Sequence, residues 1–582
     1  MEKKKRPRWK KILIWILSIL AGIILVVFVV GYFYWGNLIK GTIEDAIHKE
    51  SKGLYQADIG KLDYGIFGGH LYIRDFSLIP DTAVYNDMKA ADSAPPMLIQ
   101  LHVDKLNVYD LHLKKVIFRK IVDVKRIVIK SPDLKIMRMK EAVKDTAIQE
   151  ADTARQEIDT TQSIPLPKGW KLVTIGEILL ETGSLGFIDG SSDTVKEFTI
   201  PSFDIRISNL WVDSTWRTDP RIYNTDDIEV ILRGIRQKTG NGMYALNAGE
   251  IGLSTRQNQV YVKNFHLEPL YNRYDFTRKL GFQTDRLDIQ IEKISLLRID
   301  WRELMLHKRL IAGKLQIDSL VMDDYRDKRI PMKPGFKPPM PQQLIRELKT
   351  YIRIDSLVLS SGKANYSEQV SKEPGTISFD RLNGTLTGLT NDSLWLAEKK
   401  VSPLKAEAYL QGTGKLQATI NFVFGDPMNR FTIPSALLTS FELPQVNTML
   451  SKLLPAEFES GHVSKMIVHG IQFNDNYSKG SLTLYYKNLS FKILDEKHTA
   501  WSGIKSGVIN WIAGDILIPK SNPGPKGKLR TGTIYFERDK HKSIINFIWK
   551  STLSGLKSNM GFNTKEQKEM KKESSGKGRK KK

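Results

Sequence analysis

The chain contains no cysteine among its 582 residues. Disulfide bonds, thiol catalysis and cysteine-ligated zinc sites are therefore excluded. For a chain that leaves the cytoplasm, this composition suits a bacterial envelope better than a secretory lumen, where disulfides commonly stabilise folded domains.

The usual sequence motifs of enzymes are also missing. No HExxH, phosphate-loop or GxSxG motif occurs, and the 10 histidines show no familiar metal-ligand spacing. No two aspartates are spaced i, i+2, the arrangement with which a glycosyltransferase would hold a metal-bound sugar nucleotide. The adjacent pairs Asp226-Asp227 and Asp323-Asp324 would point to opposite faces of a strand, so we interpret both as turn or rim residues. The sequence thus predicts no enzyme, cofactor or metal site.

A concentrated basic surface is absent too. The formal net charge is +24, but much of the excess lies at the two ends, in residues 1–11 and 565–582. The remainder is spread over more than five hundred residues, which argues against a nucleic-acid partner. We expect the basic tail at 561–582 to be disordered. Attraction of its lysines to anionic lipid head groups is the alternative interpretation.

One long hydrophobic run is present near the N-terminus. Residues 12–35 are 24 residues without a charge, whereas about 20 suffice to cross a bilayer. Bulky aromatic residues follow the apolar core, where a cleaved signal peptide needs small ones. The basic flank at 1–11 predicts a cytoplasmic N-terminus. We therefore expect a single-pass, uncleaved transmembrane helix that anchors the chain and leaves most of it in the periplasm.

Beyond residue 55 the hydrophobic pattern has a period of two, interrupted by turn-forming residues, which is typical of strands. One spacing recurs: apolar, x, apolar, x, x, apolar, x, apolar, with a polar middle pair. With 41% hydrophobic residues, about five or six such matches arise by chance, and nine are present. The nine segments begin at Leu71, Leu101, Val122, Ile205, Val260, Ile289, Leu315, Ile352 and Leu484.

This spacing carries a structural consequence. Two polar residues between apolar pairs leave all four apolar side chains on one face only if the strand bulges or bends there. A sheet that curls needs such irregularities. We therefore predict a mainly β chain with a long, curved, largely antiparallel sheet, an elongated apolar groove and few short helices. Sandwich modules, in which a second sheet covers the apolar face, remain an alternative.

Two polar or proline-rich segments divide the β region. Residues 138–163 are predicted to form a mobile insertion or a solvated helix, and residues 328–341 an extended hinge or spacer. Short helices are expected within 300–310, 341–352 and 443–455. The resulting boundaries are a connecting segment at 36–52, β segments at 53–137, 164–327 and 342–560, and the basic tail at 561–582.

The N-terminal order resembles that of the AsmA-like family, which includes the longer TamB and YhdP types. The similarity lies in the basic flank, the single span, the polar segment NLIKGTIEDAIHKES and then GLYQADIGKLDYGIFGGHLYIRDFSLIPD. The segments VKRIVIKSPDLKIMR and YIRIDSLVLSSGKANYSE resemble the family's recurring strand pairs. These are periplasmic proteins anchored in the inner membrane of Gram-negative bacteria. The resemblance implies a β groove along which lipid acyl chains move between membranes.

The expected groove begins next to the predicted anchor. The candidate lining residues are Ile59, Leu62, Tyr64, Leu71, Ile73, Phe76, Leu78, Leu101, Val103, Leu106 and Val108. The expected partners are the inner membrane and a phospholipid or other envelope lipid. The expected function is therefore non-enzymatic: binding or conducting acyl chains for outer-membrane assembly or homeostasis. The alternative is a periplasmic scaffold that regulates outer-membrane protein biogenesis through outer-membrane or envelope protein partners.

Overall fold

The computed structural model describes residues 37–65, 69–91, 93–112, 115, 118–139, 166, 169–190, 196–215, 221–453, 456–494 and 519–574. The predicted basic flank at 1–11 and the predicted transmembrane helix at 12–35 lie outside these ranges, as does nearly all of the predicted insertion at 138–163. Within the described ranges, no helix has the length and hydrophobicity needed to cross a bilayer.

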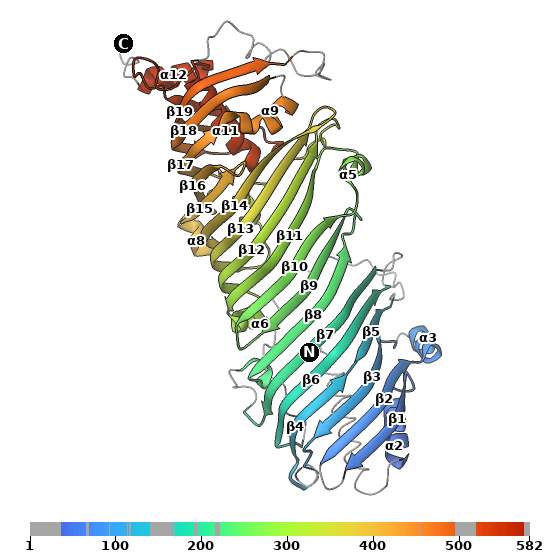
Figure 1. The fold of residues 1–582 in the computed structure, drawn as a ribbon. Helices are drawn as coiled ribbons and strands as arrows, with labels where there is room; N and C mark the ends of the chain where they lie inside the picture. Colours follow the sequence, from blue (N-terminus) through green and yellow to red (C-terminus); the bar gives the residue numbers. More distant parts are fainter. Residues whose placement is uncertain are drawn as a thin grey trace. The chain divides into compact units, whose positions relative to one another are not determined.

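The described chain is mainly β, as predicted, and its twenty described strands are assigned to one sheet (Figure 1). Most neighbouring strands are antiparallel, whereas β4 and β6, β5 and β6, and β12 and β13 pair in parallel. The described residues contain no second sheet, so the sandwich alternative is not supported. The strands are β1 (Tyr55–Gly65), β2 (His70–Pro80), β3 (Met97–Tyr109), β4 (Ile121–Lys130), β5 (Asp133–Arg138), β6 (Leu172–Asp189), β7 (Lys196–Val212), β8 (Asp227–Lys238), β9 (Tyr244–Ser254), β10 (Gln259–Pro269), β11 (Asp285–Ile299), β12 (Leu310–Asp327), β13 (Ile352–Gln369), β14 (Pro374–Thr390), β15 (Val401–Leu410), β16 (Gly414–Val423), β17 (Phe431–Glu442), β18 (Ala456–Phe473), β19 (Tyr477–Ile493) and β20 (Gly532–Glu537).

The chain forms two compact units, which we describe separately. Strands β1–β7 lie in the first unit and β11–β20 in the second, whereas β8–β10 contribute residues to both. The helices are α2 (Asn37–Glu50), α3 (Thr82–Ala90), α5 (Arg273–Leu280), α6 (Trp301–His307), α7 (Pro341–Arg346), α8 (Ser393–Ala397), α9 (Asn447–Leu453), α11 (Ile544–Asn559) and α12 (Lys565–Ser574), with 3-10 turns η1 (Ile222–Asn224) and η2 (Leu443–Val446). Helices α6, α7 and α9 confirm the three short helices predicted from the sequence.

The recurring spacing marks bends within strands. In five of the nine segments, the second residue of the polar middle pair has a φ between 52° and 56°; these are Asp75, Asn209, Asn264, Ser319 and Asn488. Four of the five are Asn or Asp, the residues other than glycine that best tolerate this left-handed conformation. In β2 the apolar residues on both sides of the bend are buried, and the middle pair is exposed. One left-handed residue therefore resets the alternation and keeps one face apolar.

The bend in β1–β2 adds no residue to either strand. Ile59 pairs with Phe76 and Lys61 pairs with Arg74, so the register is the same on both sides of the bend. Gly60 lies opposite the left-handed Asp75, and a Cβ at Gly60 would lie only 2.9 Å from the Cβ of Asp75. Of the two predicted alternatives, a bulge and a bend, this pair shows the bend, because a change of φ alone turns the side chains over. Shifted registers do occur in β6–β7, β13–β14 and β18–β19.

In the first unit, helix α2 lies along the side of β1 that is not paired with β2. The carboxylate of Glu44 accepts a hydrogen bond from the Ile59 backbone N–H at 3.0 Å, and Lys40 forms an ion pair with Asp58 at 3.5 Å. The predicted connecting segment at 36–52 is therefore largely helical and satisfies a strand that would otherwise present free backbone groups.

In the second unit, side chains of α11 and α12 form hydrogen bonds with backbone groups of β20. The backbone N–H groups of Thr533 and Tyr535 donate to Ser558 Oγ at 2.8 Å and to Ser554 Oγ at 3.2 Å. Gln567 of α12 donates to the Thr533 carbonyl at 2.8 Å. Helix side chains thus replace the missing neighbouring strand.

These two helices correct the expectations for the C-terminal region. The sequence predicted a β segment to residue 560 and a disordered tail after it. Instead, the last part of the predicted β segment forms α11, and the first part of the predicted tail forms α12. The buried positions Phe547, Ser551, Gly555 and Ser558 have the three- and four-residue spacing of a helix face. Residues 575–582 lie outside the described ranges.

We expect Asn488→Val to lower the free energy of unfolding by about 1–2 kcal/mol, because a β-branched side chain is strained at positive φ. Asn488→Gly should change it by less than about 0.5 kcal/mol, because glycine adopts this conformation freely. Urea unfolding followed by circular dichroism measures both. Equal destabilisation by the two changes would contradict the bend as the reason for Asn at this position.

Candidate functional site

The predicted groove residues of the first unit share one face but are closed off from solvent. Ile59, Leu71, Ile73, Phe76, Leu78, Val103 and Val108 are buried in one cluster, and Leu62, Leu101 and Leu106 pack against it. The side chain of Tyr64 lies outside the described part of the chain. The common face is therefore confirmed. A lipid chain could reach these side chains only if the cluster opened.

Helices contribute to this closure. Tyr85 of α3 is buried in the same cluster. Val84 and Met88 of α3 and Ile47 of α2 pack against it. Asp81 caps α3 by accepting hydrogen bonds from Ala83 N and Val84 N. A neighbouring apolar void lined by Leu71, Val108, Val124 and other aliphatic residues measures only about 20 Å³, roughly the space of one water molecule.

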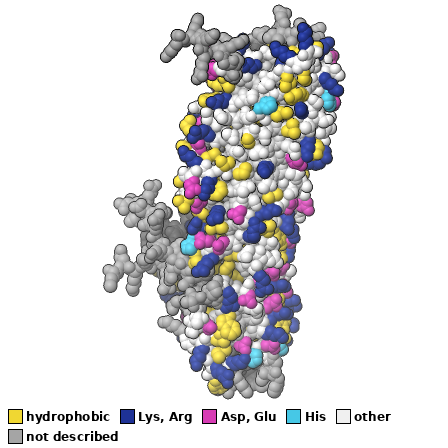
Figure 2. Space-filling model, turned by 90° about the vertical axis from the view of Figure 1, so that its left-hand side faces the viewer, with side chains coloured by type: hydrophobic (Ala, Val, Ile, Leu, Met, Phe, Trp, Pro, Cys, Tyr) yellow, Lys and Arg dark blue, Asp and Glu magenta, His cyan; other side chains and the backbone are white. Residues whose placement is uncertain are grey.

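In strands β11–β13 of the second unit, the apolar residues of the same spacing form a face that is less covered. Ten of its twelve apolar side chains there are partly exposed, and only Ile291 at 9% and Ile354 at 5% are buried. The partly exposed residues are Ile289, Ile294, Leu296, Leu315, Ile317, Leu320, Met322, Ile352, Leu357 and Leu359. We call this surface the open apolar face. Accessible hydrophobic side chains between charged ones are also visible on the side of the molecule in Figure 2.

A pocket of about 910 Å³ lies at one end of the strands of the first unit. Its lining comes from the beginnings of β4, β6 and β8 and the ends of β3 and β7, where antiparallel and crossover connections bring these termini to one edge. Leu111, Val124, Ile175 and Leu210 supply its apolar part. The volume falls within the range of about 300–1,000 Å³ typical of small-molecule sites.

The acidic groups at the pocket rim are paired with cations or amides. Lys115 Nζ lies 2.5 Å from Asp123 Oδ2, and this hydrogen bond is the main reason that the pKa of Asp123 is lowered. The Asn209 amide donates to Asp226 Oδ2 at 2.8 Å and is the main reason that the pKa of Asp226 is lowered, with Arg221 adding to it. The rim carboxylates are thus held ionised and neutralised. The turn-or-rim interpretation of the pair Asp226-Asp227 holds for Asp226, which lies just before β8, but is wrong for Asp227, which is the first residue of β8 and is buried.

The open apolar face ends in charged residues toward the carboxyl end of β12 and β13. Alternation places Leu320, Met322, Asp324 and Arg326 on the same face of β12. Arg326 binds Asp285 through two hydrogen bonds of 2.6 and 2.7 Å. In the neighbouring pair, Lys328 Nζ lies 2.5 Å from Glu368 Oε1, and Tyr366 donates to Glu368 Oε2 at 2.8 Å.

Asp324 lies where the apolar part meets the charged part. Its Oδ1 is buried without a hydrogen-bond partner. Burial, followed by repulsion from Asp285, raises the pKa of Asp324 to about 7. The interpretation of Asp323-Asp324 as turn or rim residues is therefore wrong. Both lie within β12 on opposite faces, and Asp323 forms an ion pair with Arg273 at 2.6 Å.

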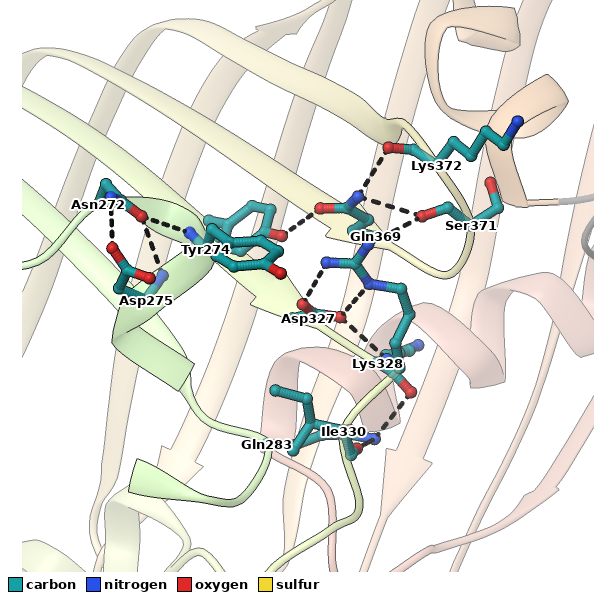
Figure 3. A network of polar contacts seen from close by, with 12 residues as sticks. Asn272, Tyr274, Asp275, Gln283, Asp327, Lys328, Ile330, Gln369, Ser371 and Lys372 are labelled. Atoms are coloured by element: carbon teal, nitrogen blue, oxygen red, sulfur yellow. Dashed lines mark hydrogen bonds and ion pairs between the residues drawn. The ribbon is translucent and has the colours of Figure 1, made fainter. Parts of the chain in front are cut away.

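A polar network fixes the strand ends beside this site (Figure 3). Gln369 donates to the carbonyls of Ser371 at 3.1 Å and Lys372 at 2.8 Å, which closes the turn after β13. Gln283 donates to the carbonyls of Lys328 at 3.3 Å and Ile330 at 2.6 Å. Lys328 is therefore held by its backbone as well as by Glu368.

The sequence carries a signal for this charged end. The period of two continues from Leu320 through Asp324 and Arg326, so the charges had to share the apolar face. Among the residues that the structure describes, no three histidine, aspartate or glutamate residues lie close enough to hold a metal ion. No family model matches the chain, and no curated protein is significantly similar to it in sequence.

We expect Ile73→Ala to lower the free energy of unfolding by about 3 kcal/mol, because Ile73 is fully buried, and Ile317→Ala to lower it by about 1 kcal/mol, because Ile317 is partly exposed. Denaturant unfolding of both variants measures the difference. A cost at Ile317 as large as that at Ile73 would show that the open apolar face is covered in solution.

We also expect Asp324→Asn to remove a pH dependence. Between pH 4 and 7 the folded chain retains a proton that the unfolded chain has released, so stability falls as pH rises and the penalty is complete above about pH 7. The variant should match the wild type near pH 4 and melt a few degrees higher near pH 8.

Asp323→Asn is the matched control for this change, because it alters the neighbouring carboxylate on the opposite face. Its melting temperature should still fall as pH rises, because Asp323 is the last in order of size among the causes that raise the pKa of Asp324. Parallel pH profiles for wild type and Asp324→Asn would contradict the raised pKa.

Proposed function

We propose that this chain binds acyl chains of lipids on its open apolar face and acts in the cell envelope without catalysing a reaction. On this proposal, the run at 12–35 anchors it in the inner membrane. The lipid is a phospholipid or another envelope lipid used in outer-membrane assembly or homeostasis. The resemblance to AsmA-like proteins supports the same function, although no family model supports it.

One observation carries the proposal. Nine of the twelve apolar side chains of this spacing are buried in β2–β4 of the first unit, whereas only two of twelve are buried in β11–β13 of the second. Exposed apolar surface costs free energy in water, at about 25 cal/mol per Å², so a row of such residues indicates a ligand or a partner. A row that follows strand after strand suits a long flexible chain better than a compact ligand.

The pocket in the first unit supplies a second apolar surface with a polar rim. Its aliphatic part can take hydrocarbon, and its paired charges can solvate a polar group at the entrance. This combination of properties suits an amphiphile. It also leaves the rim carboxylates neutralised by partners rather than poised for proton transfer.

A scaffold that binds other envelope proteins is the alternative. One common mode, addition of a partner strand to a sheet edge, is blocked at β1 by α2 and at β20 by α11 and α12. Strand addition at these two edges is therefore disfavoured for a protein partner.

We expect phospholipid to copurify with the full chain in mild detergent and to be detected by lipid mass spectrometry. Leu320→Glu should reduce the bound amount about tenfold, because a charge on the open apolar face is incompatible with hydrocarbon. Val321→Glu is the matched control, since Val321 is the next residue in β12, lies on the opposite face and is 46% exposed.

Lipid held by the predicted anchor contributes equally to both variants, so the difference between them reports on β12. Absence of phospholipid from the wild type, or equal loss in both variants, would overturn the proposal.

A further inference from the structure

Lysines from the C-terminal segment lie beside the charged end of the open apolar face. Lys542 Nζ donates to Met332 Sδ at 3.2 Å, and His541 Nδ1 lies 2.8 Å from the Phe336 carbonyl. The residues just before α11 are thus in contact with the segment that follows Lys328. Lys542 interacts electrostatically with Arg326, Lys328 and Glu368, and Lys550 with Lys328 and Glu368.

Four cations lie in this cluster, and the carboxylates near them are Asp285, Glu368, Asp539 and Asp324. The pKa of Asp324 is raised to about 7, so the cations are in excess below that pH. Asp285 forms an ion pair with Arg326, and Glu368 forms one with Lys328. Asp539 is the remaining carboxylate that acts on Lys542. Within the described ranges, neither Lys542 nor Lys550 forms an ion pair with a carboxylate. We call these two residues, with Arg326 and Lys328, the lysine cluster.

The electrostatics agree with this surplus of positive charge. Burial is the main cause that lowers the pKa of both Lys542 and Lys550, and the neighbouring cations lower it further. Both effects favour a bound anion, which would restore the charge balance. The N-terminus of α11 begins beside Lys542 and adds partial positive charge. Neighbouring protein atoms partly desolvate the ammonium group of Lys550, but the residue keeps solvent-exposed surface through which an incoming group can reach it.

Hydrophobic side chains accompany the cluster. Ile545 and Trp549 lie one turn apart on α11 and are 74% and 50% exposed. Met322 and Leu320 lie on the same face of β12 as Arg326, two and three alternate positions away. Cationic groups therefore lie at the end of an accessible hydrocarbon surface, which is the arrangement that an anion with an aliphatic tail requires.

We propose that the lysine cluster binds the anionic head of an acyl lipid, a carboxylate or phosphate, whose chain lies on the open apolar face. The inference rests on the proposed function, because the chain must bind there for the head to reach the cluster. It adds a selectivity: lipids with a net negative head are retained over those with a neutral one. Lys542 and Lys550 supply the unpaired charge, and Arg326 and Lys328 remain bound to their own carboxylates.

The test compares a fluorescent fatty acid, 11-(dansylamino)undecanoic acid, with its methyl ester on the full chain in mild detergent. The two probes share the hydrocarbon and differ in the negative charge. The wild type should bind the acid more tightly than the ester. Lys542→Gln with Lys550→Gln should weaken binding of the acid about tenfold, as expected for the loss of charge-assisted hydrogen bonds, and leave the ester unchanged.

A second double variant serves as the matched control. Lys565→Gln with Lys568→Gln removes the same charge from exposed positions on α12 and should bind both probes as the wild type does. Equal affinity for the acid in the wild type and the Lys542/Lys550 variant would overturn the proposed head-group role of the lysine cluster and leave the proposed function standing. Binding of neither probe by the wild type would overturn the proposed function, and the lysine cluster with it.

Discussion

Backbone hydrogen bonding between neighbouring strands is the constraint on which the rest of this structure depends. A strand that bends must be met by a neighbour that bends at the same level, because otherwise the ladder between them is lost. Asp75 in β2 is therefore opposite Gly60 in β1, and Asn209 in β7 is opposite Gly176 in β6. A Cβ at Gly176 would lie 2.6 Å from the Lys125 carbonyl of β4, so the third strand is also in close contact there.

These aligned bends explain why one spacing recurs in segments far apart in the sequence. Each left-handed residue turns the following side chains over, and the apolar residues stay on one face through a change of direction. The cost of a left-handed residue is about 1–2 kcal/mol for most side chains and is smaller for Asn and Asp. The use of Asn and Asp at four of the five positions fits a sheet that must bend repeatedly at little cost.

A single sheet has two costs that a globular core avoids. Its outer strands present unpaired backbone groups, and its apolar face is exposed to water unless something covers it. The outer strands are satisfied by helices, with Glu44 acting on β1 and Ser554 and Ser558 acting on β20. The burial of the apolar face differs along the chain. In the first unit it closes on itself and on α3, whereas β11–β13 leave it accessible and end it in Asp285, Arg326, Lys328 and Glu368. The proposed lipid chain and the proposed head-group site follow from this uncovered stretch and its charged end.

The sequence by itself determined the strand content, the common apolar face and the three short helices, because periods of two and of about 3.6 residues are local properties of the chain. It also placed Ile59 to Val108 on one face. Only the tertiary structure decided that this part is a closed core and that Leu315, Ile317, Leu320 and Met322 stay partly exposed, since burial depends on which elements pack above a face. The lysine cluster likewise depended on the fold, because Lys328 and Lys542 are brought together from segments more than two hundred residues apart.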